Sequence, residues 1–437
     1  MINNRLYRDG LNRLNGANGR HGASGLRGLR CASLSFIIYY LSFIISLSIF
    51  TACSSDSNDE MTVAETPIEV MGYSTWFEEN VAKTRAEGPQ KAITRAWNPP
   101  SGFSMYEDEK RSIGVFFTQD HNVPEGGYEE EYFFKSSGKW RVSKTDLKAE
   151  TYYLYGYVPY EHSADPGMLS LLSGEGKTFA DGAVLTLKNF PAITPADVCV
   201  VIGAKNGKDY YKANEDYNVI GLKPGDFAYT AQTTGESGTN GNYVFLLFDH
   251  LYAAINVNLQ VHGDYAKLRT IKLKELRMKT VAGSDTITHK TDISVTLTKT
   301  TDGTTPIAKD GSGNDLITYT PTAGAGTAVA DTLLFQSNEG VELGVNSFIP
   351  GMPYKCYFMP KDVTKLVLFS VYDVYDTKGN LTRENCLVKN TLVLSTLYSG
   401  QTVAKRGYRY TVNLTIKPTY LYVLSDPDLD SPSVVVE

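Results

Sequence analysis

The chain has 437 residues, of which 42% are hydrophobic and 21% are charged, and it contains 38 glycines. This composition excludes a collagen, a coiled coil and a wholly disordered chain, and the length suits two or three domains. Tyr occurs 29 times, more often than Phe (18) and Trp (3) combined. Because aromatic residues fit a pleated, half-buried surface, this bias favours β-sheet.

The N-terminal segment has the features of a secretory leader. Residues 1–30 contain six Arg and one acidic residue, Asp9, and an uncharged apolar run follows from Ala32 to Ala52. A transmembrane helix with its basic end inside is the alternative, since the run is long enough. The small residues Thr51 and Ala52 directly before Cys53 instead favour a bacterial lipoprotein signal peptide. Cys53 is then the acylated first residue of the mature protein.

Without this leader the chain is clearly acidic. It keeps 36 of its 42 basic and 47 of its 48 acidic residues, a net charge of −11. An acidic surface disfavours nucleic acid and anionic membranes as partners, so the lipid is the expected membrane contact. Residues 54–60 (SSDSNDE) are typical of a flexible tether, and they also resemble the acidic stretch of surface-exported lipoproteins in some Gram-negative bacteria.

Strand patterns fill most of the remaining chain. They cover residues 112–117, 151–160, 198–204, 243–261, 268–278, 293–297, 365–375, 381–388, 408–416 and 420–424. Apolar residues alternate with polar ones from Ile255 to Val261, a period of two with one buried face. The turn at Asp376–Asn380 predicts a β-hairpin. The best helix candidate is Trp76–Ala86, and it is short.

The fold class predicted from these patterns is all-β, with two antiparallel β-sandwich (transthyretin-like) domains in tandem. The expected domain boundary lies near His262-Gly263-Asp264, after the long alternating strand. This gives a signal peptide over residues 1–52, a tether and N-terminal segment over 53–95, and sandwiches over 96–262 and 263–437.

Motifs for catalysis or nucleotide binding are missing from the sequence. The six His are isolated, without the spacing of metal ligands. Residues 173–178 contain Gly-Lys-Thr, but Leu171 stands where a phosphate-binding loop needs Gly, so a surface loop is the better interpretation. Residues 426–430 space three Asp two apart, but a calcium loop also needs a glycine turn and a closing Glu, so a turn is favoured.

The cysteines point the same way. Cys199, Cys356 and Cys386 lie in apolar, strand-like runs, without the spacing of a disulfide framework or a metal site. They are interpreted as buried small hydrophobic residues. We therefore predict no catalytic residues, no metal ligands and no cofactor, and a protein that is not an enzyme.

Several short segments, in a fixed order after the lipoprotein leader, resemble a known family. They are Pro67–Val70, two Thr-Arg-Ala sequences, Ile113–Val115, Tyr155–Pro159, Phe248–Ala253, Val371–Asp376, Arg409–Leu414 and Pro418–Asp428. In this order they resemble the fimbrillin family, the lipoprotein-precursor pilin subunits of type V fimbriae of anaerobic Gram-negative bacteria. The resemblance extends over nearly all of the mature chain.

The resemblance implies a mechanism of assembly. In such pilins an Arg-specific protease removes the N-terminal segment with one strand, and a strand from another subunit fills the groove. The corresponding removable strand here contains Ile68 and Val70, and cleavage is expected between Arg95 and Ala96, or between Arg85 and Ala86. As alternatives, each Arg is only a solvated charge, or an anchor or tip subunit is not cut at all.

The candidate donor strands are at the C-terminal end, at Thr419–Leu424 and Pro432–Val436. Tyr420, Tyr422 and Leu424 share one face, and burying three such side chains contributes about 5–9 kcal/mol as an upper bound. Strand addition from a partner also satisfies an open sheet edge. The alternative is that both segments pair within their own domain.

These observations favour a structural subunit of an adhesive fimbria, made as an outer-membrane lipoprotein precursor and exported to the cell surface. Its expected partners are other pilin subunits, the outer membrane through the lipid anchor, an Arg-specific protease, and a host protein or glycan. A monomeric tip adhesin or glycan-binding surface lipoprotein is the alternative, in which the abundant Tyr stack on sugar rings. An enzyme on a β-scaffold is the least favoured class.

Overall fold

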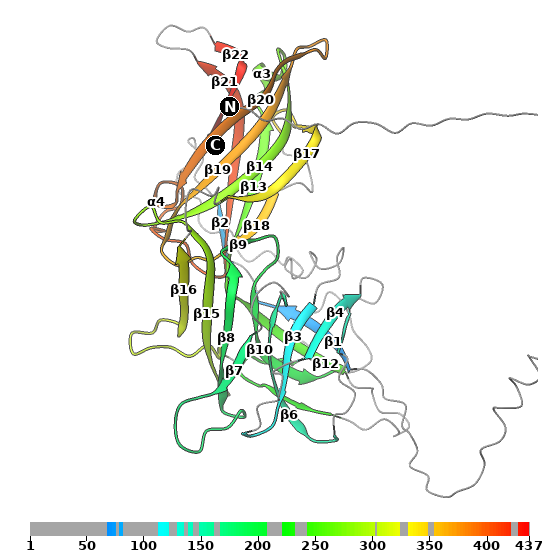
Figure 1. The fold of residues 1–437 in the computed structure, drawn as a ribbon, viewed down its shortest axis with the longest axis vertical. Helices are drawn as coiled ribbons and strands as arrows, with labels where there is room; N and C mark the ends of the chain where they lie inside the picture. Colours follow the sequence, from blue (N-terminus) through cyan, green and yellow to red (C-terminus); the bar gives the residue numbers. More distant parts are fainter. Residues whose placement is uncertain are drawn as a thin grey trace, which may run out of the picture. The chain divides into compact units, whose positions relative to one another are not determined.

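The computed structural model (Figure 1) describes one compact unit within residues 63–437. The described residues are 68–75, 78–81, 112–121, 129–134, 139–142, 148–160, 167–207, 221–231, 243–301, 304–323, 331–347, 354–420 and 427–436. Almost all of their regular structure is β-strand, arranged in four sheets. The predicted all-β class is therefore confirmed.

The first sheet has eight strands, in the order β10-β12-β1-β5-β4-β3-β6-β11. Their bounds are β10 Cys199–Asn206, β12 Tyr243–His250, β1 Ile68–Ser74, β5 Lys139–Val142, β4 Glu129–Phe134, β3 Ser112–Thr118, β6 Thr151–Val158 and β11 Ala228–Thr230. Strand β10 pairs with β12 on one edge and with β6 on the other, so the sheet closes on itself. The strand β1 is one member of this closed ring.

The two faces of the ring contribute to different apolar clusters. The outer face, with Phe116, Tyr155 and Leu247, packs against a four-stranded sheet in the order β16-β15-β8-β7. The bounds of that sheet are β16 Ile317–Ala323, β15 Thr288–Thr298, β8 Gly182–Pro191 and β7 Met168–Leu171. The enclosed face holds a second cluster, which includes Val115 and Leu246.

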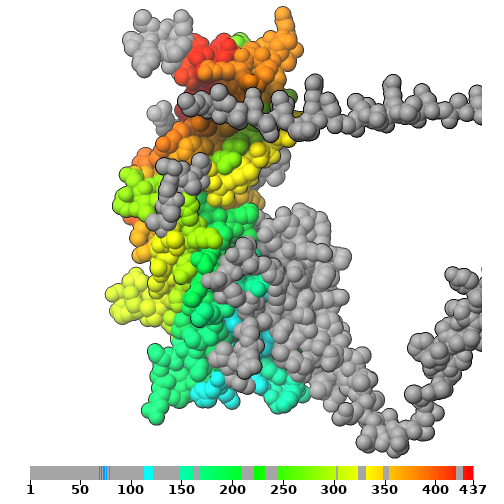
Figure 2. Space-filling model, viewed as in Figure 1, coloured from blue at the N-terminus to red at the C-terminus, as the bar shows by residue number. Residues whose placement is uncertain are grey.

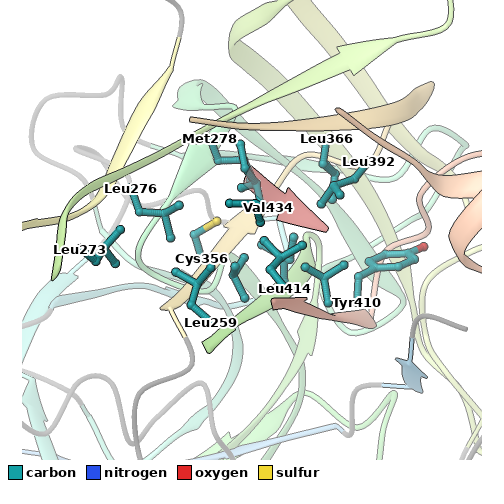
Figure 3. Packing of buried hydrophobic residues seen from close by; sticks show 14 of the residues in the cluster. Leu259, Leu273, Leu276, Met278, Cys356, Leu366, Leu392, Tyr410, Leu414 and Val434 are labelled. Atoms are coloured by element: carbon teal, nitrogen blue, oxygen red, sulfur yellow. The ribbon is translucent and has the colours of Figure 1, made fainter. Parts of the chain in front are cut away.

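The other two sheets enclose a third cluster, part of which is drawn in Figure 3. One is six-stranded, in the order β2-β21-β13-β18-β9, with β22 also paired to β21, and the other runs β17-β14-β19-β20. The bounds are β2 Glu78–Val81, β21 Tyr408–Tyr420, β13 Ala253–Val261, β18 Tyr354–Phe358, β9 Ile193–Thr194, β22 Pro427–Val436, β17 Thr332–Glu342, β14 Thr270–Ala282, β19 Val363–Tyr375 and β20 Leu381–Val393. Leu259, Leu276 and Leu414, from three different strands, meet in this cluster.

Strand pairing crosses the expected domain boundary near residue 262 in both directions. β13 precedes that boundary but pairs with β18 and β21, which follow it. β15 follows the boundary but pairs with β8, which precedes it. Alternation of apolar residues predicted these strands, but it carries no information about which distant strand each one joins.

Helix is rare in the described part of the chain. Two four-residue helices are present, α3 (Gly263–Ala266) and α4 (Leu394–Leu397), and no helix among the described residues is long and apolar enough to span a membrane. The helix predicted over Trp76–Ala86 is wrong at its centre, where residues 78–81 form β2. Parallel pairing with residues 408–411 of β21 overrides the weak local preference there.

Candidate functional site

Strand β1 lies inside the closed sheet with a partner on each edge. It runs parallel to β12, with residues 69–74 aligned to residues 243–248, and antiparallel to β5, with residues 68–70 opposite residues 140–142. Its backbone groups are therefore part of two hydrogen-bonded ladders. Removal of β1 from this position would expose the ladder edge of β12 as well as that of β5.

The side chains of β1 fill both faces of the ring. Ile68 and Val70 are each 1% exposed and belong to the enclosed cluster, which agrees with the alternation in the sequence. Tyr73 points to the opposite face and meets Phe245 edge-on, with 5.8 Å between the ring centroids. Because both faces are buried, β1 contributes to the core on each side of the sheet.

Directly after β1, Thr75 makes three hydrogen bonds to the end of β12. Its backbone N–H donates to the Phe248 carbonyl at 2.9 Å, and its hydroxyl donates to Asp249 Oδ1 at 2.6 Å. The carbonyl of Thr75 faces His250 Nε2 at 2.9 Å. The N–H, the hydroxyl hydrogen and the carbonyl of Thr75 are therefore all bound by three consecutive residues, 248–250.

His250 is enclosed and paired on its other ring nitrogen. Its side chain is 1% exposed, and Nδ1 lies 2.7 Å from Asp197 Oδ2 and 3.5 Å from Cys199 Sγ. Burial alone would lower the pKa of His250, but the charge and hydrogen bond of Asp197, with the charge of Asp249, raise it above the ordinary value. Burial also raises the pKa of the Cys199 thiol, so that group stays neutral.

These three buried side chains are also the right types for a metal site, since they offer one carboxylate, one thiol and one imidazole within 4.8 Å of one another. The geometry fits an ion pair better. Asp197 Oδ2 and His250 Nδ1 lie 2.7 Å apart, in direct contact. The arrangement is thus explained by direct contact between the side chains.

Arg406 holds Asp249 from the side opposite Thr75. Its Nη1 donates to Asp249 Oδ2 at 2.9 Å and to the His250 carbonyl at 3.0 Å, and its Nε donates to Asp315 at 2.8 Å. The guanidinium therefore bridges two carboxylates, which keep it charged. A pocket of about 660 Å³ borders Arg406, Asp249 and Thr75, so solvent reaches this side of the network.

After Thr75 the chain continues to β2, in the neighbouring sheet. The Glu78 N–H donates to the Gly407 carbonyl at 2.7 Å, and residues 78–81 then pair with residues 408–411. A hydrogen bond from Tyr408 to the Glu78 carboxylate raises the pKa of Tyr408 to about 12. The N-terminal segment is therefore bound to two sheets, with the Thr75 contacts between its two strands.

The C-terminal strand β22 pairs with β21 of its own chain. Residues 427–436 run antiparallel to residues 414–420, and Val434 is buried in the third cluster. Asn390 of β20 donates to the Val434 carbonyl at 2.8 Å. Figure 2 shows β22 (red) at the surface next to the orange residues of β20. β22 and β2 lie on the same edge of β21, one after the other along that strand.

The predicted site residues are only partly described. Tyr420 is the last residue of β21, where its backbone pairs with Pro427. Cys53, Arg85, Ala86, Arg95, Ala96, Tyr422 and Leu424 lie outside the described residues. Residues 173–178 form bends and turns between β7 and β8, and Asp428 and Asp430 lie within β22.

Sequence reasoning missed the polar network around Thr75. Asp249 and His250 appeared only as part of the Phe248–Ala253 resemblance, and Arg406 was not singled out. The available signal was an Asp-His pair that ends a strongly apolar strand, because charged residues are rarely buried unless they are paired.

Comparison with known proteins gives matches among solved structures only. No family model matches the sequence, and no curated protein matches it. A candidate cell adhesion protein from Bacteroides fragilis is 12% identical, with a TM-score of 0.36 and coverage of 85% of this chain and 97% of that one. A fimbrial protein from Bacteroides vulgatus is 13% identical, with a TM-score of 0.33 and coverage of 85% and 98%.

The chain is also similar to the fimbrial anchor protein Mfa2 from Porphyromonas gingivalis. That match is at 10% identity, with a TM-score of 0.24 and coverage of 84% of this chain and 95% of that one. Because the identities and TM-scores of these structures are low, we argue the function from this chain's own residues.

Proposed function

We propose that this protein is a subunit of a cell-surface adhesive fimbria that polymerises by strand exchange. Proteolysis after Arg85 or Arg95 removes the N-terminal segment with β1, and a C-terminal strand of another subunit takes the vacant place. One observation carries the proposal. β1 is an internal strand of a closed sheet, paired on both edges, with Ile68 and Val70 each 1% exposed.

The free energy of burial favours replacement of β1 by another strand over its loss without replacement. The place that β1 leaves in the closed sheet is called the slot. Burying two such side chains contributes about 3–6 kcal/mol, and each ladder hydrogen bond adds about 0.5–1.5 kcal/mol. A ring without β1 loses these terms and presents an open, apolar strand edge to solvent. A strand from a second subunit restores them, and head-to-tail repetition of that contact builds a filament because it does not close.

The donor in this proposal is the C-terminal end of a neighbouring subunit, residues 419–424 or β22. β22 is an edge strand in which Pro432 and Val434 are buried and Leu429 and Val436 are half-buried against the third cluster, so its departure breaks one ladder and exposes these side chains. Residues 421–426, which precede β22, contain Tyr422 and Leu424, the side chains expected to enter the slot together with Tyr420.

Controlled proteolysis of the purified precursor tests this function. An Arg-specific protease should remove the N-terminus after Arg85 or Arg95, as read by mass spectrometry. The cut protein should then form oligomers that survive mild urea during gel filtration. Arg85→Gln/Arg95→Gln is the matched control and should stay monomeric. A chain that ends at residue 418 lacks both candidate donors, so it should accept a strand but not donate one, and it should cap the oligomers. A cut protein that has lost its N-terminal fragment and still remains monomeric would overturn the proposal.

Pairing of β22 within its own chain favours a second candidate, a monomeric tip adhesin or glycan-binding surface lipoprotein. In that case β1 is a permanent strand, and the same protease leaves the described part of the chain intact and monomeric. The proteolysis experiment therefore separates the two candidates.

The proposal includes the route to the cell surface. Cys53 carries the lipid of an outer-membrane lipoprotein precursor, and the protein is exported to the surface before processing. Labelling with a palmitate analogue should mark the wild-type precursor and not the Cys53→Ala variant, with Cys31→Ala as the control that keeps the label. Host proteins or glycans are the adhesion partners in this proposal, and no enzymatic activity is part of it.

A further inference from the structure

Every described contact of the N-terminal segment lies before the two candidate cleavage sites. β1, Thr75 and β2 end at residue 81, whereas Arg85 and Arg95 come later in the chain. Cutting the peptide bond after either Arg breaks none of the ladders to β12, β5 or β21. The cut segment is therefore still bound by non-covalent contacts. The strength of these contacts determines how quickly the segment dissociates.

We propose that Asp249, His250 and Arg406 form a latch, a hydrogen-bonded group that binds Thr75. Release of the cut segment from this latch, and not the cleavage itself, is then the slow step before assembly. This inference rests on the proposed function, because it concerns the segment that the proposed protease removes. The latch is distinct from the pairing of β1, since it acts on Thr75, which follows the last residue of that strand.

The contacts of His250 favour a charged latch. A backbone carbonyl can only accept, so His250 Nε2 carries the hydrogen that faces Thr75 O at 2.9 Å. Asp197 Oδ2 lies 2.7 Å from Nδ1 as an ion-pair partner, and although burial alone would lower the pKa of His250, the charges of Asp197 and Asp249 raise it, which favours the imidazolium. The Thr75 carbonyl therefore receives a charge-assisted hydrogen bond inside the protein, where such bonds are strong.

The hydroxyl of Thr75 meets the opposite charge. It donates to Asp249 Oδ1 at 2.6 Å, and the same oxygen accepts the backbone N–H of His250 at 2.9 Å. Arg406 fixes the carboxylate through Oδ2, so Asp249 cannot turn away from Thr75 without breaking its bond to the guanidinium. Arg406 is a positioning residue here, because it acts on Thr75 through Asp249.

The burial of these groups explains why the latch releases slowly. His250 is 1% exposed and Asp197 is fully buried, so water reaches the His250 ring only after the segment has begun to move. Departure of Thr75 leaves a buried imidazolium with one unsatisfied N–H, which is costly. The exposed side, at the pocket beside Arg406, gives solvent access to Asp249 but not to His250.

Thr75→Val tests the latch with the least disturbance, because valine keeps the shape of threonine and the change lies on the departing segment. After proteolysis the wild-type fragment should remain bound through gel filtration, as read by native mass spectrometry. In the variant the fragment should leave about 10- to 100-fold faster, the effect of one hydrogen bond to a charged group. Thr286→Val removes a hydroxyl hydrogen bond of 2.7 Å in the β14–β15 turn and should leave the release rate unchanged.

A second measurement does not depend on cleavage. In the uncut chain, amide hydrogen exchange of Val70 and Tyr73 should accelerate in Thr75→Val and in Asp249→Asn by a similar factor, but not in Thr286→Val. Immediate loss of the fragment from the cut wild-type protein, or unchanged exchange in both latch variants, would overturn the inference. Failure of the cut protein to oligomerise after the fragment has left would instead count against the proposed function alone.

Discussion

The strands nearest the two ends of the described chain, β1 and β22, are held in opposite ways. β1 lies inside a closed sheet, has partners on both edges and buries side chains on both faces. β22 lies at the outer edge of β21, and most of its residues are only half-buried. A strand of the first kind leaves a slot when it departs, whereas a strand of the second kind leaves only the edge of its neighbour.

The two strands also differ in how far away their partners are in the sequence. β22 follows β21 directly, so the pair is a local hairpin that can re-form quickly. Thr75, next to β1, contacts Asp249, which is 174 residues away. The chain connection gives β1 a high effective concentration at its place in the sheet, and the proposed proteolysis would remove that advantage. This difference supports the proposal that β1 is the strand that is lost and β22 the strand that exchanges.

The largest expected difference between the strands concerns their buried side chains. Ile68→Ala should lower the free energy of unfolding by about 2–5 kcal/mol, because it leaves a cavity inside a ring that cannot collapse without breaking a ladder. Urea denaturation followed by tryptophan fluorescence measures this loss. A loss below about 1 kcal/mol would mean that β1 is not part of the stable core.

The charge of His250 predicts a pH dependence that belongs to β1 alone. The pKa of His250 is raised, so its contribution to stability is complete below the ordinary value near 6.5 and is lost as the pH rises through the raised value. Asp197 and Cys199 contact the ring of His250, Asp249 accepts from its backbone N–H, and Arg406 donates to its backbone carbonyl. Each pH unit in that window should lower the free energy of unfolding by about 1.4 kcal/mol.

Urea midpoints between pH 6 and pH 9 measure this dependence. His250→Gln should lose it, and His121→Gln, which changes an exposed histidine, should keep it. A wild-type midpoint that rises steadily with pH through this window would contradict the assigned charge of His250.

Val434→Ala is the matching change in β22. We expect a loss of about 1–2 kcal/mol, because two methyl groups are removed from a buried side chain at a sheet edge, where neighbouring atoms can relax into the space. The same urea titration compares it with Ile68→Ala. An equal loss in both variants would remove the contrast between the two strands.

The sequence predicts those features of β1 and β2 that depend on neighbouring residues, and not those that depend on residues far away in the chain. The alternation of Ile68 and Val70 is local, so it predicted a strand, and the structure agrees. It did not predict that Tyr73 is buried on the opposite face. The four residues of β2 carry no such pattern. Their strand conformation depends on pairing with β21, more than 300 residues later in the chain, so the local sequence did not predict it. Similarly, nothing local connects Asp197, Asp249 and Arg406, which meet only after the sheets have formed.

The smallest expected effect concerns an ion pair between β22 and Arg269, which precedes β14. Arg269 Nε donates to Asp430 Oδ1 at 2.8 Å, and the two side chains are 20% and 44% exposed. Partly exposed pairs of this kind contribute little, so Asp430→Asn should lower the free energy of unfolding by less than about 1 kcal/mol, and less still in 0.5 M salt. Urea titration at two salt concentrations measures both values. If β22 is the exchanging strand, this variant should nevertheless speed oligomer formation after proteolysis, because it weakens pairing within the chain without changing the slot that β1 leaves.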